Sequence, residues 1–366
     1  MRLLTHTVTP QEAGLPVRTL LRRQLRISGS FLAKLKWRPG AITLNGIPVI
    51  VSARTEAGDV LAADVSDLPG ENPHIRPVAY PLDILWEDED LLLLNKPAGI
   101  AIHPSALTEE TVTVAGAVCH YLRTGSFHCV NRLDRGTTGV MAVAKTGYIH
   151  RLCMESLHSD SFLREYRGIC LGAPQPLSGS IDLPISRDPG SLLRRTVDPM
   201  GLPARTLYET LLPGELSLLR LLPQTGRTHQ LRLHLSAVGH PLAGDWLYGT
   251  EDPALIPRPA LHSYRLRLLH PVPRRWLDVT APLPEDMRRA HLYGDWDAMA
   301  GQYFRELSRQ RHVIAPFELP CWWRRFRSMD WGYNDPCCVL WHAVDGDGRI
   351  YTYRELYVRQ QRADQV

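Results

Sequence analysis

Apolar positions in the first 70 residues of this 366-residue chain follow first a helical and then a hairpin pattern. An apolar stripe at every third or fourth position predicts a helix around 17–25. A second short helix is predicted at 31–35, after the Ser28-Gly29-Ser30 break. Asn45-Gly46 separates two short apolar runs, which is a strong hairpin signal. The pattern therefore predicts a small first domain, 1–70, of two helices on a hairpin.

After a Pro-containing linker at 71–80, the chain changes to short apolar runs typical of strands. Two strands around an acidic turn are predicted at 84–94, a buried strand at 140–145 and another strand at 164–171. The stretch 148–163 is amphipathic enough for a helix. At 231–235, Leu alternates with Arg232 and His234, which fits a half-buried strand or the start of a helix. This region, 81–290, is the predicted main domain.

The last region, 291–366, differs in composition and is rich in Trp and Arg up to residue 325. Two strands are predicted at 339–341 and 350–356, joined by the turn Asp345-Gly346-Asp347-Gly348. This change of pattern predicts a separate C-terminal segment.

Positive charge is concentrated locally, because the formal net charge of the whole chain is only +4. Between Arg18 and Arg38 there are seven basic residues and no acidic one. Such a run is most often a solvated helix face, but one-signed charge on two helices and a hairpin fits binding to a phosphate backbone better. The candidate RNA-binding residues are Arg18, Arg22, Arg23, Lys34, Lys36 and Arg38.

Several functional classes find no support in the sequence. The seven cysteines are scattered without paired metal spacing, which indicates reduced thiols. His229 and His234 have no third ligand at a recognisable spacing, so we predict no zinc site. No Gly-Lys-Ser/Thr phosphate loop, signal segment or membrane-length apolar run occurs. We expect a soluble cytoplasmic protein, monomeric, with neither metal nor cofactor.

The strongest candidate for chemistry is the window 130–140, where Asp134 stands between Arg132 and Arg135. Gly136-Thr137-Thr138-Gly139 follows and leads into the apolar run. An arginine neighbour favours the ionised form of a carboxylate. Taken alone, the window more often means a surface ion-pair cluster and a turn.

This window resembles the signature of the RluA-type RNA pseudouridine synthases, His-Arg-Leu-Asp-x-x-Thr-Ser-Gly, with Asn131 in place of His and Thr138 in place of Ser. Three more segments match the family in the right order. They are Lys96-Pro97-Ala98-Gly99 with His103-Pro104, then 226–232 (Gly-Arg-Thr-His-Gln-Leu-Arg), then 239–249 with Leu261-His262-Ser263. In the family, the first of these closes one side of the active cleft, although taken alone Lys96 would be a surface lysine.

The resemblance implies an α+β fold with a mixed, largely antiparallel sheet, and isomerisation of uridine to pseudouridine in structured RNA. Asp134 would be the catalytic carboxylate, Arg232 its charge partner, ahead of Arg227, and Tyr166 the platform for the base. A strand tyrosine is otherwise most often a packing residue. Arg132 would hold the target nucleotide, and Thr137, Arg227 and Leu231 would also contact the substrate. Large-subunit ribosomal RNA is the expected substrate and transfer RNA the second; the alternative is a non-catalytic RNA-binding or ribosome assembly factor.

Two further resemblances concern the flanking regions. Residues 1–70 resemble the alpha-L RNA-binding module. Residues 291–366 resemble the opening of the RNase H-like nuclease domain of phage terminase large subunits, in which the residue aligned with Asp330 binds metal. Only 36 residues follow Asp330 in the 366-residue chain, too few for a full carboxylate set. Because the ATPase loop is also missing, we expect an incomplete, inactive fragment rather than a DNA-packaging component.

Overall fold

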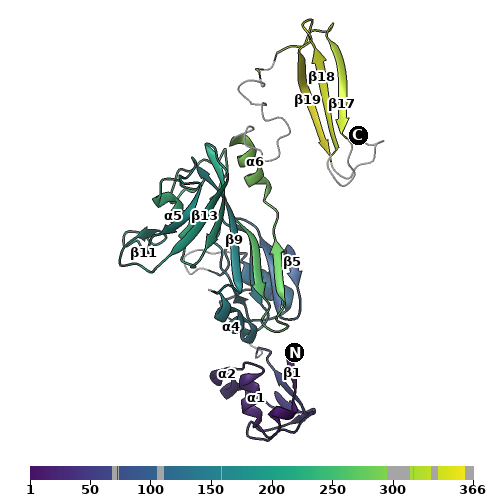
Figure 1. The fold of residues 1–366 in the computed structure, drawn as a ribbon, viewed down its shortest axis with the longest axis vertical. Helices are drawn as coiled ribbons and strands as arrows, with labels where there is room; N and C mark the ends of the chain where they lie inside the picture. Colours follow the sequence, from purple (N-terminus) through teal and green to yellow (C-terminus); the bar gives the residue numbers. More distant parts are fainter. Residues whose placement is uncertain are drawn as a thin grey trace. The chain divides into compact units, whose positions relative to one another are not determined.

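The computed structural model describes residues 1–67, 72, 74–104, 111–157, 159–294, 314–315, 317–330 and 337–358. The chain divides into two compact units, Met1–Tyr303 and Phe304–Val366 (Figure 1). The first unit contains the N-terminal region and the large sheet that carries the candidate site.

The N-terminal region is a four-stranded antiparallel sheet, in the order β1-β4-β2-β3, with two short helices. Ser28 caps the second helix by accepting a hydrogen bond from the backbone N–H of Phe31. Asn45 and Gly46 both have positive φ, as the tight turn of the hairpin requires. The predicted helices and hairpin are confirmed. The elements are β1 Leu3–Thr7, the 3-10 helix η1 Pro10–Glu12, α1 Val17–Arg23, α2 Gly29–Leu35, β2 Ile42–Leu44, β3 Ile47–Pro48 and β4 Val60–Asp64.

This region shares its apolar core with the domain that follows it. Leu20 of α1 and Ile149 of the later helix α4 (Gly147–Ser156) belong to one buried cluster. The Tyr148 hydroxyl donates a hydrogen bond to the carbonyl of Leu25 at 2.5 Å. Arg2 forms a two-point ion pair with the buried Asp90, at 2.7 and 2.9 Å. These contacts join the two parts across the predicted linker.

The central element is a ten-stranded sheet in the order β10-β13-β14-β9-β15-β8-β6-β5, with β16 beside β15 and β7 beside β8 (Figure 1). The β15–β8 pair is parallel and the other pairs of this sheet are antiparallel, so the predicted mixed sheet is confirmed. The strands are β5 Ile84–Glu87, β6 Leu91–Lys96, β7 His128–Cys129, β8 Thr138–Ala144, β9 Phe162–Leu171, β10 Ser178–Asp182, β13 Arg205–Leu212, β14 Leu216–Pro223, β15 Leu261–Leu269 and β16 Trp276–Thr280. Beside them lie a small hairpin, β11 Ile185–Arg187 and β12 Arg195–Val197, and the helices α3 Val114–Leu122, α4, α5 Gln230–Ala237 and α6 Glu285–Gly294.

Two local predictions need correction. The predicted helix at 148–163 ends at Ser156, and Phe162 already belongs to β9. Residues 231–235 form the helix α5, so the half-buried strand is wrong and the helix alternative is confirmed. The alternation of Leu with Arg232 and His234 suggested a strand with one polar face in water. Both polar side chains are instead buried, because each finds partners inside the fold.

The C-terminal unit contains a three-stranded antiparallel sheet in the order β17-β18-β19. Asp345 closes the predicted turn by accepting hydrogen bonds from the N–H groups of Asp347 and Arg349 at 2.9 and 2.8 Å. The two predicted strands are confirmed as neighbours, whereas the side chain of Asp330 lies outside the described residues. Helix α6 runs across the predicted boundary at 290/291. The strands are β17 Arg324–Asp330, β18 Cys337–Val344 and β19 Ile350–Val358.

Candidate active site

A cavity of about 370 Å³ lies between the loop before β8, the end of α4, strand β9 and the segment from β14 into α5. It contains every catalytic and substrate-binding residue that the sequence predicted for the main domain. These residues, far apart in sequence, are Arg132, Asp134, Thr137, Tyr166, Arg227, Leu231 and Arg232. The fold thus gathers the predicted residues into one place.

Asp134 lies on a short turn that leads directly into the buried strand β8. The N–H of Thr137 donates to the carbonyl of Asp134 at 3.0 Å and closes the turn. Gly139 then takes a φ of +105°, and a Cβ there would lie 2.2 Å from the carbonyl oxygen of Ser263, so only glycine fits. The Asp134 side chain keeps 28% of its surface exposed and can meet a substrate in the cavity.

The two departures from the family signature have local partners. Asn131 is buried, and its amide oxygen accepts the N–H of Ala142 at 2.8 Å, which ties the loop to β8. The hydroxyl of Thr138 lies 2.8 Å from Nδ1 of His262. Both side chains are therefore satisfied inside the fold.

Lys96 supports the Asp134 turn from behind, so its interpretation as a surface lysine is wrong. The side chain is 2% exposed, and its ammonium donates to the carbonyls of Pro97, Arg135 and Thr137 at 2.8, 3.0 and 3.0 Å. Burial lowers the pKa of Lys96 to about 7, against the opposing attraction of Asp134. Lys96 does not line the cavity, so it acts through the position of the turn.

We expect Lys96→Met to lower kcat by roughly 10- to 100-fold with little change in KM, because a loosened turn misplaces Asp134. Steady-state kinetics on the RNA substrate would show this, with the melting temperature measured in parallel. Lys145→Met is the matched control, since Lys145 makes an outer ion pair with Glu87. Equal kinetics in both variants would contradict the supporting role.

Arg232 is shared by two carboxylates. Its Nη1 lies 3.8 Å from Oδ2 of Asp134, while its Nε and Nη2 each donate to Asp245 at 2.7 Å. The ring of Tyr248 lies 5.2 Å from the guanidinium carbon. Burial would lower the pKa of Arg232, but the hydrogen bonds and charge of Asp245 outweigh it and raise that pKa. Arg232 is therefore a fixed positive charge beside Asp134.

Asp245 is a residue that the sequence analysis did not single out. It is fully buried, and besides Arg232 it accepts the N–H groups of Leu247 and Tyr248 at 3.1 and 3.2 Å. The only available signal was its place in the matching segment 239–249. The local sequence, an Asp between Gly and Trp, gives no indication that this carboxylate pairs with a buried arginine.

The cavity has an apolar floor and one exposed cation. Tyr166 is 7% exposed and belongs to one apolar cluster with Leu133, Leu231 and Leu261, and burial raises the pKa of its phenol. Arg132 is exposed and has no ion-pair partner among the described residues. A planar base fits such a floor, and a phosphate fits such a cation.

The remaining candidates make contacts within the protein. Arg227 donates from Nε to the carbonyl of Pro203 at 3.1 Å. His234, weighed as a metal ligand, uses both ring nitrogens on Thr206 and the carbonyl of Leu183, at 3.0 and 2.9 Å. Within the described ranges, no group of three or more His, Cys, Asp or Glu side chains is placed to hold a metal ion.

Known proteins share this sequence over most of its length. The family model for RNA pseudouridylate synthase matches residues 90–237. The uncharacterized RNA pseudouridine synthase YjbO of Bacillus subtilis is 37% identical over 271 residues, 73% of this chain and 95% of that protein. Ribosomal large subunit pseudouridine synthase D of Yersinia pestis is 37% identical over 267 residues, 67% of this chain and 80% of that protein. The structure of human RNA pseudouridylate synthase domain containing 1 aligns with a TM-score of 0.46 at 26% identity, over 55% of this chain and 83% of that one.

The fold and the Asp-Arg cavity thus occur in a chain that belongs to the RNA pseudouridine synthase family. The protein is an enzyme of that class, as the resemblance implied. Within the part of the chain that is described, no helix has the length and apolarity needed to span a bilayer.

Proposed function

We propose that this protein converts a uridine of large-subunit ribosomal RNA to pseudouridine, with Asp134 acting at the sugar. The observation that carries the proposal is a half-buried carboxylate beside an arginine that a second, buried carboxylate holds in place. Relatives named ribosomal large subunit pseudouridine synthase D support the choice of RNA. No energy or redox cofactor is needed for an isomerisation.

The reaction breaks the bond from the sugar to a ring nitrogen of uracil and makes a bond from the sugar to a ring carbon. That carbon loses a proton and the nitrogen gains one, so atoms and electrons balance. Asp134 serves either as the nucleophile at the anomeric carbon or as the base at the neighbouring carbon. Tyr166 and Leu231 form the floor on which the free base turns, and Thr137 and Arg227 line the space around it.

A base in a structured RNA must leave its stack to reach this cavity. Arg132 is the exposed cation at its edge and would hold the displaced nucleotide by its phosphate. Stacking on Tyr166 would replace part of the lost base stacking, worth about 1–3 kcal/mol.

The deciding experiment is carbodiimide mapping of pseudouridine in total RNA from cells with and without this gene. We expect one site in large-subunit ribosomal RNA to vanish on deletion, and to return with wild type but not with Asp134→Asn. If the lost site is in transfer RNA instead, then transfer RNA and not ribosomal RNA is the substrate. No lost site in any RNA would favour the non-catalytic assembly factor.

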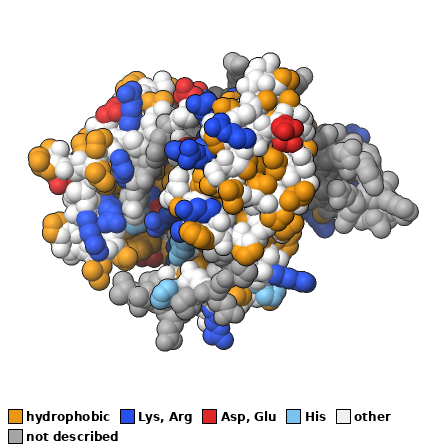
Figure 2. All heavy atoms as spheres, turned by 90° about the horizontal axis from the view of Figure 1, so that it is seen from below, with side chains coloured by type: hydrophobic (Ala, Val, Ile, Leu, Met, Phe, Trp, Pro, Cys, Tyr) orange, Lys and Arg blue, Asp and Glu red, His pale blue; other side chains and the backbone are white. Residues whose placement is uncertain are grey.

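We further propose that residues 1–70 act as an RNA-binding module of the alpha-L type. Five of the six predicted basic residues are exposed: Arg18, Arg22, Arg23, Lys34 and Lys36. Trp37 beside them is 79% exposed, with the Lys36 ammonium 5.1 Å from its ring centre. Figure 2 shows Lys and Arg side chains gathered with hydrophobic ones on the face seen from below, with few acidic ones among them.

Arg38 is the exception among the predicted RNA-binding residues. Its guanidinium pairs with Asp64 at 2.5 Å and donates to the carbonyl of Ser66 at 3.0 Å. Because these bonds hold the last strand of the N-terminal sheet, Arg38 has a structural role, and we withdraw it as an RNA contact.

Neutralising Arg22, Arg23 and Lys34 together to Gln should weaken RNA binding and flatten its salt dependence. Each lost phosphate contact lowers the slope of log affinity against log salt by about 0.7–0.9. Filter binding at several salt concentrations measures this. The control removes three exposed arginines elsewhere, Arg274, Arg275 and Arg289. If the slope of log affinity against log salt is the same in wild type and in the triple variant, residues 1–70 do not bind RNA through these three side chains.

For the C-terminal unit we propose an inactive fragment related to terminase nuclease domains. Three antiparallel strands in chain order, with Asp330 at the end of the first, are what supports it. A Mg²⁺- or Mn²⁺-dependent nuclease activity that disappears in Asp330→Ala would contradict it. The monomeric state and cytoplasmic location stay predictions from the sequence.

A further inference from the structure

A second cavity, of about 260 Å³, lies next to the active-site cavity, beyond the end of strand β14. We call it the side pocket. Arg164, Leu157 and Pro223 line both cavities, so the two are neighbours.

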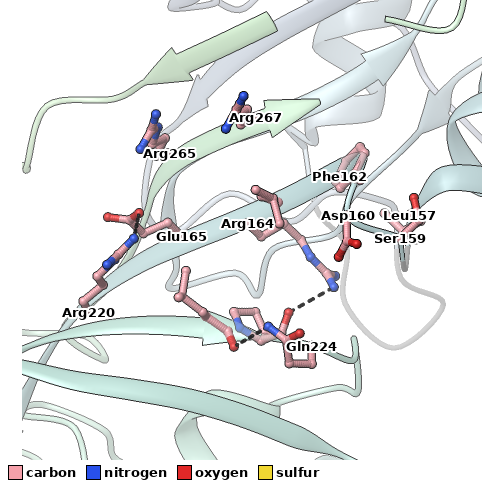
Figure 3. A pocket seen from close by; sticks show the side chains of 13 residues that line it. Leu157, Ser159, Asp160, Phe162, Arg164, Glu165, Arg220, Gln224, Arg265 and Arg267 are labelled. Carbon is pink, nitrogen blue, oxygen red and sulfur yellow. Dashed lines mark hydrogen bonds and ion pairs between the residues drawn. The ribbon is translucent and has the colours of Figure 1, made fainter. Parts of the chain in front are cut away.

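The side pocket forms because two neighbouring strands end at different points. The register between β14 and β9 stops at Tyr166, whereas β9 extends back to Phe162 along β15. Among the described residues, no strand pairs with this part of β9 on the β14 side. The side chain of Arg164 lines this gap and points toward Gln224, as Figure 3 shows.

The charge of the side pocket is unevenly balanced. Four arginines and two carboxylates line it. Arg220 pairs with Glu165 and Glu209, and Arg265 pairs with Asp278 through two nitrogens. Arg164 and Arg267 have no ion pair among the described residues, and Arg267 instead stacks on Trp276, 4.4 Å from its ring centre. The four lining arginines thus outnumber the two lining carboxylates, Asp160 and Glu165.

Arg164 also has hydrogen bonds left to make. Its Nε is buried and has no partner, and its Nη2 reaches the carbonyls of Pro223 and Thr225 only at 3.4 Å. Bonds of that length are weak, and a buried N–H without an acceptor costs about 1–3 kcal/mol. An anion with several oxygens, bound at Arg164, would satisfy these donors.

We propose that the side pocket binds a backbone phosphate of the substrate RNA, close to the nucleotide held in the active site. The inference rests on the proposed action on RNA, which supplies a phosphate at every nucleotide. Arg164 stands two residues before Tyr166 on the same face of β9, so a chain whose base stacks on Tyr166 passes Arg164 next. Arg164 is the inner ligand, and Arg267 is the outer one.

The test uses a short RNA stem-loop that carries the mapped uridine, with one methylphosphonate at a time near it. Binding is measured with Asp134→Asn protein, so that turnover does not interfere. We expect one methylphosphonate position to weaken binding about tenfold, since a hydrogen bond to a charged group contributes roughly this much. Adding Arg267→Gln should weaken binding to unmodified RNA and reduce the methylphosphonate effect at that position, because Arg164 remains as the inner ligand.

Two controls make the outcome specific. Arg275→Gln, an exposed arginine of the β15–β16 turn outside the pocket, should keep the full methylphosphonate effect. Arg267→Lys should restore most of the binding, which a purely packing role on Trp276 would not require. An equal methylphosphonate effect with and without Arg267, or none at any position, overturns the inference. If wild type forms no pseudouridine in any RNA, the proposed function fails instead.

Discussion

Asp134→Asn should abolish pseudouridine formation, with a loss of roughly 10⁴-fold or more, because Asp134 is the only carboxylate among the described residues that line the cavity. The amide keeps the size of the side chain, and the basic surface of the N-terminal region is untouched. RNA binding should therefore stay near the wild-type level. Single-turnover assays on the stem-loop, together with binding at matched salt, measure both quantities.

The arrangement around Asp134 makes this variant informative. Arg232 keeps its two hydrogen bonds to Asp245 when Asp134 becomes neutral, so the fold should hold. If Asp134→Asn melts and binds RNA like wild type but forms no pseudouridine, the Asp134 carboxylate takes part in the reaction itself. Retained turnover would remove Asp134 from its role.

Asp245→Asn should have the largest effect on stability, because it leaves the buried Arg232 with half its counter-charge. Breaking a buried ion pair from one side costs about 3–5 kcal/mol. Arg232 would also turn toward Asp134, the only other carboxylate with which it forms an ion pair in the described structure. We therefore expect kcat to fall at temperatures where the variant is still folded, which urea unfolding and kinetics at 15–25 °C would show.

Glu285→Gln is the matched control, since it removes a carboxylate from two exposed ion pairs, with Arg288 and with Arg289. Exposed pairs contribute about 0–1 kcal/mol, so its unfolding curve should overlap that of wild type. If Asp245→Asn were as stable as this control, Asp245 would not hold Arg232 in the way the structure indicates.

Two charged residues outside the cavity support the candidate site: Lys96, which the sequence analysis placed only in a cleft-closing motif, and Asp245, which it did not single out. Lys96 fixes the backbone of the Asp134 turn, and Asp245 fixes Arg232. Neither has a predicted role in contact with the substrate. Variants of Lys96 and Asp245 should therefore change kcat and leave KM nearly unchanged, whereas variants of residues that contact the substrate should also change KM.

The sequence by itself determined the family, the order of the regions and the chemical groups of the site. Four motifs in the right order indicated the family, and two of them contain the candidate residues Asp134 and Arg232, whereas Tyr166 came from the family resemblance of the strand at 164–171. Local patterns also predicted the β2–β3 hairpin and the strands β5, β6, β8, β9, β18 and β19, since alternation and turn chemistry act between near neighbours.

The tertiary structure alone decided which charges are buried and what they bind. Arg232 meets Asp245 across 13 positions, Arg38 meets Asp64 across 26, and Lys96 meets Thr137 across 41. No repeat in the sequence links such pairs. Sequence patterns are interpreted on the assumption that charged side chains face water, so 231–235 stayed open between a strand and a helix, and Lys96 taken alone was a surface residue. The side pocket arises in the same way, because it depends on where β14 ends beside β9, which is a property of strand register in space.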